Sequence, residues 1–226
     1  ADRAKKTERP FAAKTYVEHI KLNEAVFRDF AWPSYVLGNH DSKRFLSKLG
    51  EGEDAVRKAK VLAALLLTLR GTPFVYYGEE IGMREAVIPY EKIVDPQGKN
   101  LWPNNVGRDG CRTPMPWNAS PHAGFSQTEP WLPIGEDARE VNVERQKAEP
   151  GSMFHYYKQL IRIRKESEAL RFGRLELLDT KDPALMGFFR IGESERVLVL
   201  LNFEDRKVVL NLKGFGVEVR RYIGGT

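Results

Sequence analysis

Apolar and polar positions divide the chain into segments with different periods. The apolar run Tyr35-Val36-Leu37 ends at Gly38 and predicts a short buried strand. Residues 55–69 are rich in good helix formers and almost wholly apolar after residue 60, so they predict a helix that is covered on several sides. Residues 73–77 are again apolar and predict a second buried strand. A strand, a helix and a strand with short links predict a βαβ unit with parallel strands.

Two more helices are predicted, one before this unit and one after it. Residues 14–30 have apolar residues at helical spacing, which places these side chains on or near one face: Tyr16, Val17, Ile20, Phe27 and Phe30. Residues 152–166 repeat that spacing. They begin at Ser152, a residue type that caps helix N-termini, and carry basic residues late in the segment.

The remaining segments have other patterns. Residues 81–151 contain nine prolines and no sustained period, but their tryptophans argue against disorder, so we expect an ordered, irregular active-site loop. Short β-rich runs follow at residues 184–191, 196–203, 206–212 and 217–222. Turn residues separate these runs, which predicts an antiparallel sheet.

These patterns predict an α/β part followed by an all-β part. We assign residues 1–30 to a helix leading into the first part, residues 31–172 to the α/β part, and residues 173–226 to a small β domain. The length of 226 residues is sufficient for a substantial core.

Composition excludes several classes of protein. The formal charge is +5, but acidic residues are interleaved with the basic ones and no nucleic-acid module is present, so we expect no nucleic-acid partner. The longest apolar run, residues 61–69, is too short to span a bilayer, and we expect no membrane partner. Cys111 is the only cysteine, which favours a reducing, cytoplasmic location. The first residue is not Met, which suggests that the chain starts inside a longer one.

Candidate chemistry follows the first predicted strand. Asn39, His40 and Asp41 stand directly after it, at the end of the strand where parallel α/β folds place their active sites. Taken alone, three polar residues after a strand are more typical of a surface turn than of an active site.

Longer motifs make the pattern specific. The segments are residues 36–41 (VLGNHD), 71–83 (GTPFVYYGEEIGM), 107–117 (GRDGCRTPMPW), 123–126 (AGFS) and 130–133 (PWLP). In this order they resemble glycoside hydrolase family 13, the α-amylase superfamily, and within it the bacterial α-glucosidase and oligo-1,6-glucosidase branch. The resemblance implies the C-terminal part of a (β/α)8 TIM barrel, with strands seven and eight at residues 32–38 and 73–77, followed by a small antiparallel β-sandwich.

The resemblance also implies roles for individual side chains in a retaining mechanism. Asp41 matches the third catalytic acid, which holds sugar hydroxyls and stabilises the transition state, and His40 matches the neighbouring sugar-binding histidine. Arg108 matches an arginine that closes the glucose pocket by pairing with an acid from an early barrel loop. Asn39 orients the turn. Arg44 is either a counter-charge for Asp41 or a packing residue.

Other polar residues of these motifs are expected to have structural roles. We expect Arg112 and Asp109 to fix the loop through internal hydrogen bonds. Glu79 and Glu80 are expected to anchor the loop after the second strand. Tyr76 and Tyr77 are expected to lie in the core.

The sequence departs from the family at its central chemistry. The family's nucleophile stands in a Gly-x-Arg-x-Asp context after strand four and its general acid follows strand five, and neither context is present; the nearest echo, Arg28-Asp29, precedes strand seven. We therefore expect a C-terminal portion of an α-glucosidase that is inactive alone, with the N-terminal part of the same enzyme as partner and maltose- or isomaltose-type oligosaccharides as substrates.

Alternatives remain open at this stage. One is a fragment of a trehalose synthase or sucrose isomerase, and another is a non-catalytic interaction protein derived from the same family. No cofactor or metal is expected. A structural calcium occurs in some members, but its usual ligands are not identifiable in this sequence.

Overall fold

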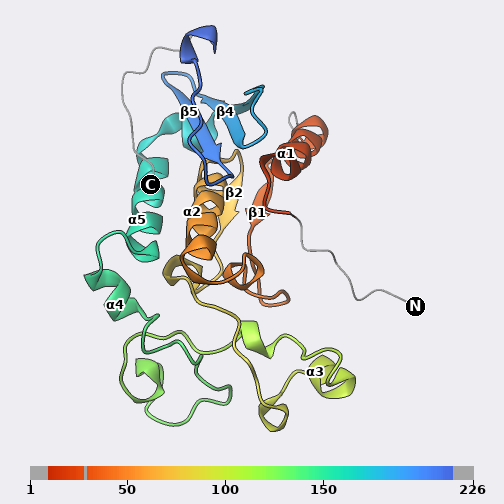
Figure 1. Ribbon diagram of the computed structural model, residues 1–226, viewed down its shortest axis with the longest axis vertical. Coiled ribbons are helices and arrows are strands. Elements are labelled where there is room, and N and C mark those ends of the chain that lie inside the picture. Colours follow the sequence, from red (N-terminus) through yellow and green to blue (C-terminus); the bar gives the residue numbers. More distant parts are fainter. Residues whose placement is uncertain (1–9, 28–29, 216–226) are drawn as a thin grey trace.

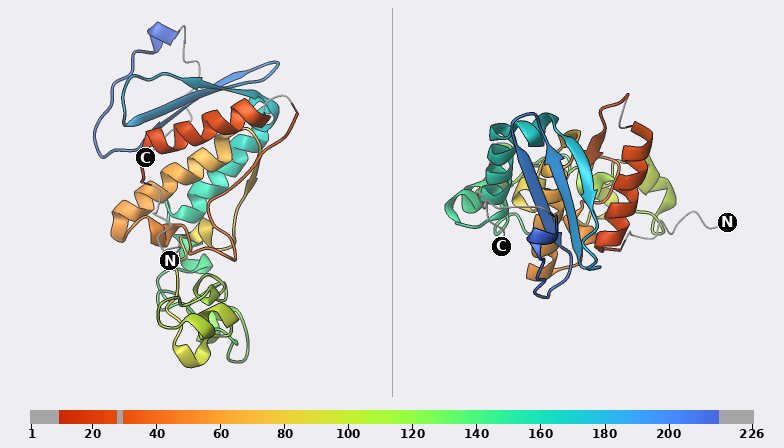
Figure 2. Two further views of the ribbon diagram at one scale, coloured as in Figure 1. Left: turned by 90° about the vertical axis from the view of Figure 1, so that its right-hand side faces the viewer. Right: turned by 90° about the horizontal axis from the view of Figure 1, so that it is seen from above.

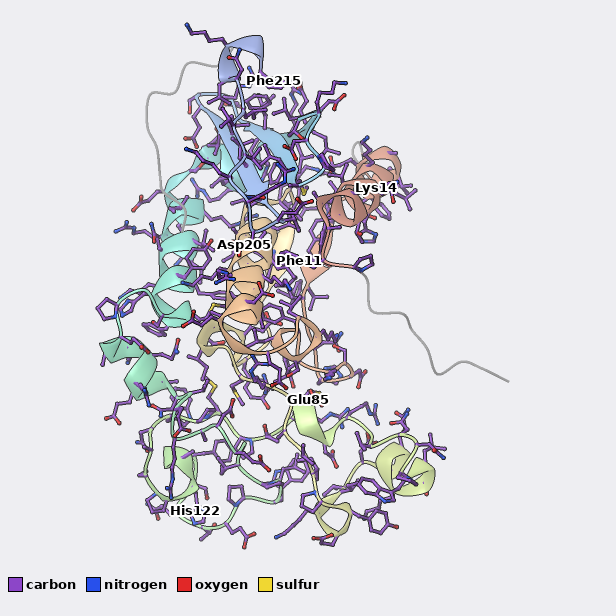
Figure 3. The ribbon with its side chains drawn as sticks, viewed as in Figure 1. Phe11, Lys14, Glu85, His122, Asp205 and Phe215 are labelled. Carbon is purple, nitrogen blue, oxygen red and sulfur yellow. The ribbon has the colours of Figure 1, made fainter. Side chains whose placement is uncertain are left out.

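The computed structural model describes residues 10–27 and 30–215. Helices α1, α2 and α5 and the strands form the upper body in Figure 1, and a largely irregular segment that contains α3 and α4 lies below them. Between these parts lies Glu85, which is labelled in Figure 3.

The predicted βαβ unit is confirmed. Strand β1 (Ser34–Val36), helix α2 (Gly52–Thr68) and strand β2 (Thr72–Phe74) follow one another, and the two strands are parallel with Ser34 opposite Thr72. Helix α2 begins three residues earlier than predicted, with Glu53 and Asp54 in its first turn, where negative charge is favourable.

The expectation that both strands are buried is wrong. The side chains of Val36 and Phe74 are 51% and 58% exposed. The reason is that β1 and β2 hydrogen-bond only to each other within the described residues, so no further strand or helix covers this face of the pair.

Gly71 is required where α2 returns to β2. It adopts a φ of +126°, and a Cβ atom there would lie 2.4 Å from the carbonyl oxygen of Pro33. The glycine therefore lets the backbone of β2 approach β1 closely enough for the Thr72 amide to donate to the same Pro33 oxygen at 2.9 Å.

The first helix is shorter than predicted. Helix α1 spans Ala13–Phe27, and its Ile20 is buried as expected. Phe27 and Phe30, assigned to the same apolar face, are instead 37% and 77% exposed, and Phe30 lies beyond the described helix. Figure 2 shows α1 beside the upper sheet.

Helix α5 (Met153–Glu166) confirms the prediction for residues 152–166. Its N-cap is Ser152, whose hydroxyl accepts a hydrogen bond from the amide of His155. Helix α5 packs against α2 (Figure 2), and the short helix α6 (Glu168–Phe172), which the sequence pattern did not predict, follows it.

The C-terminal sheet has three antiparallel strands in the order β3-β4-β5. Strands β4 (Leu185–Ile191) and β5 (Arg196–Asn202) were predicted, whereas β3 (Arg174–Leu178) was not. The strand predicted at residues 206–212 is absent: residues 207–211 have no strand partner among the described residues, and a short helical turn begins at Leu212. The strand predicted at residues 217–222 lies outside the described residues.

A shared core connects the sheet to the helices. One apolar cluster contains Leu62 and Leu65 of α2 together with Met186 and Phe188 of β4. The sheet therefore packs directly on the α/β part. The described strands after residue 172 form one sheet, and among the described residues no second sheet of C-terminal strands faces it. The domain boundary at residue 172 stays a prediction.

The expected irregular segment, residues 81–151, is ordered by short helices and single turns. Helices α3 (Pro96–Leu101) and α4 (Val143–Ala148) are capped by the side chains of Asp95 and Asn142. In the described ranges, no helix combines the length and apolar character needed to cross a bilayer.

Candidate functional site

The turn after β1 presents three polar residues, as predicted. The Asn39 side-chain oxygen accepts a hydrogen bond from the Asp41 amide at 2.9 Å, which sets the turn. His40 is largely exposed, and its Nε2 lies 3.5 Å from Oδ2 of Asp41. The turn therefore brings an imidazole and a carboxylate together on an accessible surface.

Two arginines converge on the same oxygen of Asp41. Arg108 and Arg112 each donate to Oδ1 at 3.0 Å, while the Asp41 side chain is still 54% exposed. Partial desolvation raises the pKa of the Asp41 carboxyl, but the hydrogen bonds from both arginines and the nearby positive charges outweigh it and hold the pKa below its ordinary value. Asp41 is therefore an ionised acceptor with lone pairs left for a ligand.

Arg108 is held by an acid that the sequence reasoning did not identify. The Asp95 carboxylate accepts from Nε and NH2 of Arg108, both at 2.8 Å, and its side chain is 0% exposed. Arg108 was expected to pair with an acid from an early barrel loop, and within the described residues it pairs instead with Asp95, 13 residues before it. The guanidinium lowers the pKa of Asp95, outweighing the effect of burial.

Arg112 and Asp109 differ in their outcome. Asp109 fixes the loop as expected, because its Oδ2 accepts from the amides of Val94 and Asp95 at 2.7 and 2.8 Å. Arg112 instead reaches the turn after β1, where it donates to the carbonyl of His40 at 2.8 Å and to Asp41. The sequence did hold a sign that Arg112 lies near Arg108. The two arginines are four residues apart, and a single helical turn, Asp109–Cys111, separates them.

Arg44 is a packing residue. It is 2% exposed, donates to the carbonyl of Tyr77 at 2.7 Å, and lies over the rings of Tyr76 and Tyr77 at 5.3 and 4.7 Å. Within the described residues it has no hydrogen bond or ion pair with Asp41. The counter-charge role is therefore wrong for Arg44 and belongs to Arg108 and Arg112.

The residues after β2 link the loop to the helical body. The hydroxyls of Tyr76 and Tyr77 donate to the carbonyls of Cys111 and Thr113 at 3.1 and 2.6 Å, so both anchor the loop that carries the arginines. The expectation that they lie in the core is wrong, since Tyr76 is only partly buried and Tyr77 is 36% exposed. Glu79 is 3% exposed, and burial raises its pKa to about 8. Its protonated form is therefore favoured in the folded chain near neutral pH.

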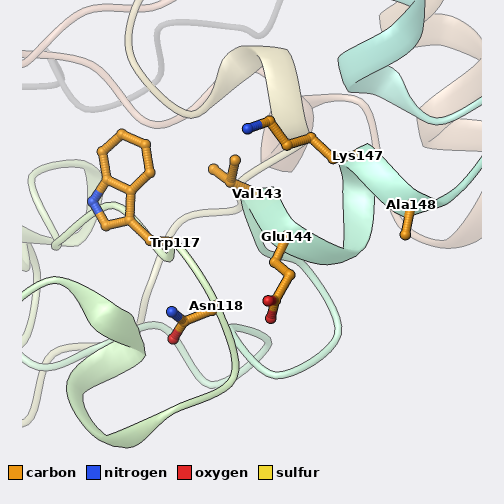
Figure 4. A pocket seen from close by; sticks show the side chains of 6 residues that line it. All are labelled: Trp117, Asn118, Val143, Glu144, Lys147 and Ala148. Atoms are coloured by element: carbon orange, nitrogen blue, oxygen red, sulfur yellow. The ribbon is translucent and has the colours of Figure 1, made fainter.

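A hollow of about 530 Å³ lies elsewhere in the irregular segment. Figure 4 shows its lining: Trp117, Asn118, Val143, Glu144, Lys147 and Ala148. None of these belongs to the predicted site.

The described residues offer no metal centre, because no group of three or more histidine, cysteine or acidic side chains is arranged to hold an ion there. Within the same ranges, Asp95 is buried and fully engaged by Arg108. The cluster can therefore bind hydroxyl groups and stabilise positive charge, and it contains one accessible carboxylate, Asp41.

Comparison with known proteins gives consistent results. The family model described as alpha amylase, catalytic domain, matches residues 1–173. A probable alpha-glucosidase from Rhizobium meliloti is 40% identical over 194 residues, covering 83% of this chain and 35% of that protein. An oligo-1,6-glucosidase from Parageobacillus thermoglucosidasius is 36% identical over 202 residues, and the match covers 80% of this chain and 36% of the glucosidase.

Solved structures show the same similarity. The alpha-glucosyl transfer enzyme XgtA matches with a TM-score of 0.79 and 35% identity, covering 86% of this chain and 36% of that one. Trehalulose synthase MutB from Pseudomonas mesoacidophila matches with a TM-score of 0.76 and 30% identity, covering 86% of this chain and 39% of the enzyme. The chain thus spans little more than a third of the length of these relatives.

Proposed function

The chain belongs to the alpha-amylase family of glycoside hydrolases, and from this membership we propose that it is the C-terminal portion of a retaining α-glucosidase. In this proposal Asp41 stabilises the transition state during exo-hydrolysis of α-linked gluco-oligosaccharides such as maltose or isomaltose. The observation that carries the proposal is the exposed, ionised Asp41 carboxylate, held by two arginines at the end of a strand.

The proposed chemistry follows from this charge distribution. A carboxylate beside the sugar ring accepts hydrogen bonds from two neighbouring hydroxyls, and these bonds strengthen as positive charge develops in an oxocarbenium-like transition state. His40 contacts the same part of the ring. Arg108 closes the glucose pocket, and Asn39 keeps the turn in shape.

We also propose that β1 and β2 are the seventh and eighth strands of a (β/α)8 barrel, with residues 173–226 as a C-terminal β domain. The exposed apolar side chains of Val36 and Phe74 support this proposal, because neighbouring barrel strands would cover them. A partner segment, equivalent to the part of the relatives that this chain does not match, would then supply the nucleophile and the general acid.

The test uses p-nitrophenyl α-glucoside and a sample whose intact mass is 25.8 kDa. We expect no turnover by the chain alone and turnover after adding the separately produced N-terminal portion of an oligo-1,6-glucosidase. In the mixture, Asp41→Asn should lower kcat by more than about 10²-fold, as expected when a group that stabilises transition-state charge is removed. Exposed Asp205→Asn is the matched control. Turnover by the chain alone would contradict the proposed division of catalytic groups.

A transferase or isomerase is the second candidate. It is supported by the similarity to an alpha-glucosyl transfer enzyme and a trehalulose synthase. Product analysis of the same mixture with sucrose separates the two functions, because isomerisation conserves the disaccharide whereas hydrolysis releases glucose. If no sugar binds and no product forms, a non-catalytic interaction role is favoured.

A further inference from the structure

Asp95 contacts Arg108 through three separate donors. Its Oδ2 accepts from the backbone amide and from Nε of Arg108, and its Oδ1 accepts from NH2, each at 2.8 Å. Two parallel bonds between a carboxylate and a guanidinium fix the plane of the arginine as well as its position. Because Asp95 is 0% exposed, these bonds are shielded from water.

Asp95 is itself fixed by its surroundings. Its amide and that of Val94 donate to Asp109, and its Oδ1 accepts from the amide of Gln97 at the start of α3. Gly107 packs against it so closely that a Cβ atom there would lie 2.9 Å from Oδ2. The carboxylate therefore has little freedom to follow Arg108 if the arginine moves.

One guanidinium nitrogen remains, and it meets Asp41. With Nε and NH2 occupied by Asp95, NH1 of Arg108 points to Oδ1 of Asp41 at 3.0 Å. The exposed fraction rises along this chain of contacts, from 0% at Asp95 to 35% at Arg108 and 54% at Asp41. The rigid end is buried, and the end available to a ligand is accessible.

We propose that Asp95 is a positioning residue that holds the Arg108 guanidinium against Asp41 and thereby orients the carboxylate for its ligand. This inference rests on the proposed role of Asp41. A second consequence follows from charge, because Asp95 neutralises one arginine. The two carboxylates, of Asp41 and Asp95, then balance the charges of two guanidinium groups, those of Arg108 and Arg112. The surroundings of the ionised Asp41 therefore have no excess positive charge from these four residues.

The test is Asp95→Asn in the full chain. Asparagine keeps the size of the side chain and an oxygen that can cap α3. It loses the negative charge and one of the two oxygens that accept hydrogen bonds from the Arg108 side chain. We expect the Nε–H of Arg108 to exchange with solvent more than about tenfold faster in NMR experiments, as suits the loss of a charge-assisted bond. A ¹³C titration of Asp41 separates two effects of this change: loss of the Asp95 charge alone lowers the pKa of Asp41, whereas loss of the Arg108 hydrogen bond raises it.

Asn142→Ala is the matched control. It removes a buried helix cap in the same irregular segment, and the side-chain hydrogen bonds of Asn142 go to the backbone of residues 138, 139 and 145 rather than to Arg108 or Arg112. It should leave both NMR signals unchanged. If Asp95→Asn does not fold, Arg108→Lys answers the same question: the single ammonium should stay with the buried Asp95 and leave Asp41 free to titrate higher.

An Arg108 Nε–H that exchanges at the wild-type rate in Asp95→Asn, or an Asp41 pKa that does not rise in the charge-conserving Arg108→Lys, would overturn the positioning role and leave Asp95 as a structural residue. The titration reports on the chain by itself. A mixture that fails to hydrolyse glucosides would therefore contradict the proposed function without altering this result.

Discussion

At the scale of single residues, Glu79 is a titratable group buried outside the Asp41 cluster. Burial raises its pKa to about 8, and the neighbouring Glu80 adds to this effect, while Arg44 and the backbone of Tyr76 and Gly38 oppose it. An acid whose pKa is raised by folding binds a proton in the native state that the unfolded chain releases. Its stabilising contribution is complete below pH 4.5 and is lost as the pH rises toward 8.

Glu79→Gln should therefore make stability less dependent on pH. Urea unfolding should show little difference from the wild type near pH 5 and a variant that is more stable near pH 8.5, by an amount on the order of 4 kcal/mol. Part of the slope will remain, since burial also raises the pKa of Glu80 and Glu85. The exposed Glu149→Gln should reproduce the wild-type slope, and equal slopes in all three proteins would contradict the assignment to Glu79.

Some residues of the Asp41 cluster could be predicted from the sequence and others could not. Asp41, His40 and Arg108 stand in motifs, so a family resemblance was enough to find them. Asp95 was missed because its role depends on a tight loop that folds residues 95 and 108 together, and no local pattern records that contact. For Arg44 the sequence left packing and a counter-charge role open, and the contact that decides between them, with the tyrosines that follow β2, is not visible in a local pattern.

At the scale of elements, α1 is tied to the βαβ unit by a buried ion pair. Glu24 accepts from Nε of Arg70 at 3.1 Å, and both side chains are 7% exposed. Arg70 also donates to the carbonyls of Phe27 and Ala31, so it joins the end of α1 to the chain leading into β1. Removing one member of such a pair leaves the other charge buried and unpaired.

Glu24→Gln should therefore destabilise the chain by about 3 kcal/mol in urea unfolding. The control is Glu18→Gln in the same helix, because Glu18 pairs with Lys14 in an exposed i,i+4 bridge. Its effect should stay within about 0.5 kcal/mol. Similar effects for the two variants would mean that the buried pair does not hold α1 in place.

Elements with strong local signals were predicted, and those set by long-range pairing were not. Helix α5 has a side-chain N-cap, and α2 and α5 each combine helix formers and apolar residues in one continuous segment. Strand β3 was not predicted, because its extended conformation depends on antiparallel pairing with β4, which the local sequence does not show. Residues 206–212 have the composition of a strand, but Val209 is 85% exposed and the described structure gives this segment no strand partner.

At the scale of the whole molecule, the open face of β1 and β2 decides how the chain behaves in solution. Val36 and Phe74 lie opposite each other in the parallel pair and are 51% and 58% exposed. Apolar side chains beside unpaired strand edges promote association with other strands. Burial of this face was the expectation that failed most clearly, because it depends on strands that the described residues do not contain.

We expect the chain alone to self-associate in a concentration-dependent manner in sedimentation velocity experiments. Replacing Val36 and Phe74 together by threonine keeps β propensity but removes apolar surface, so the variant should remain monomeric over the same range. Phe172→Thr with Val209→Thr changes two apolar residues that are even more exposed, at 66% and 85%, but belong to neither β1 nor β2, and this variant should associate like the wild type.

The partner segment provides the decisive comparison. If the N-terminal portion of a relative covers this face as we propose, its addition should replace self-association by a one-to-one complex, and the threonine variant should bind it more weakly. If the double threonine variant self-associates like the wild type, the surface responsible for association lies outside Val36 and Phe74. A chain that stays monomeric at all concentrations would show that the strand pair needs no cover, and the barrel assignment would then lose its main physical support.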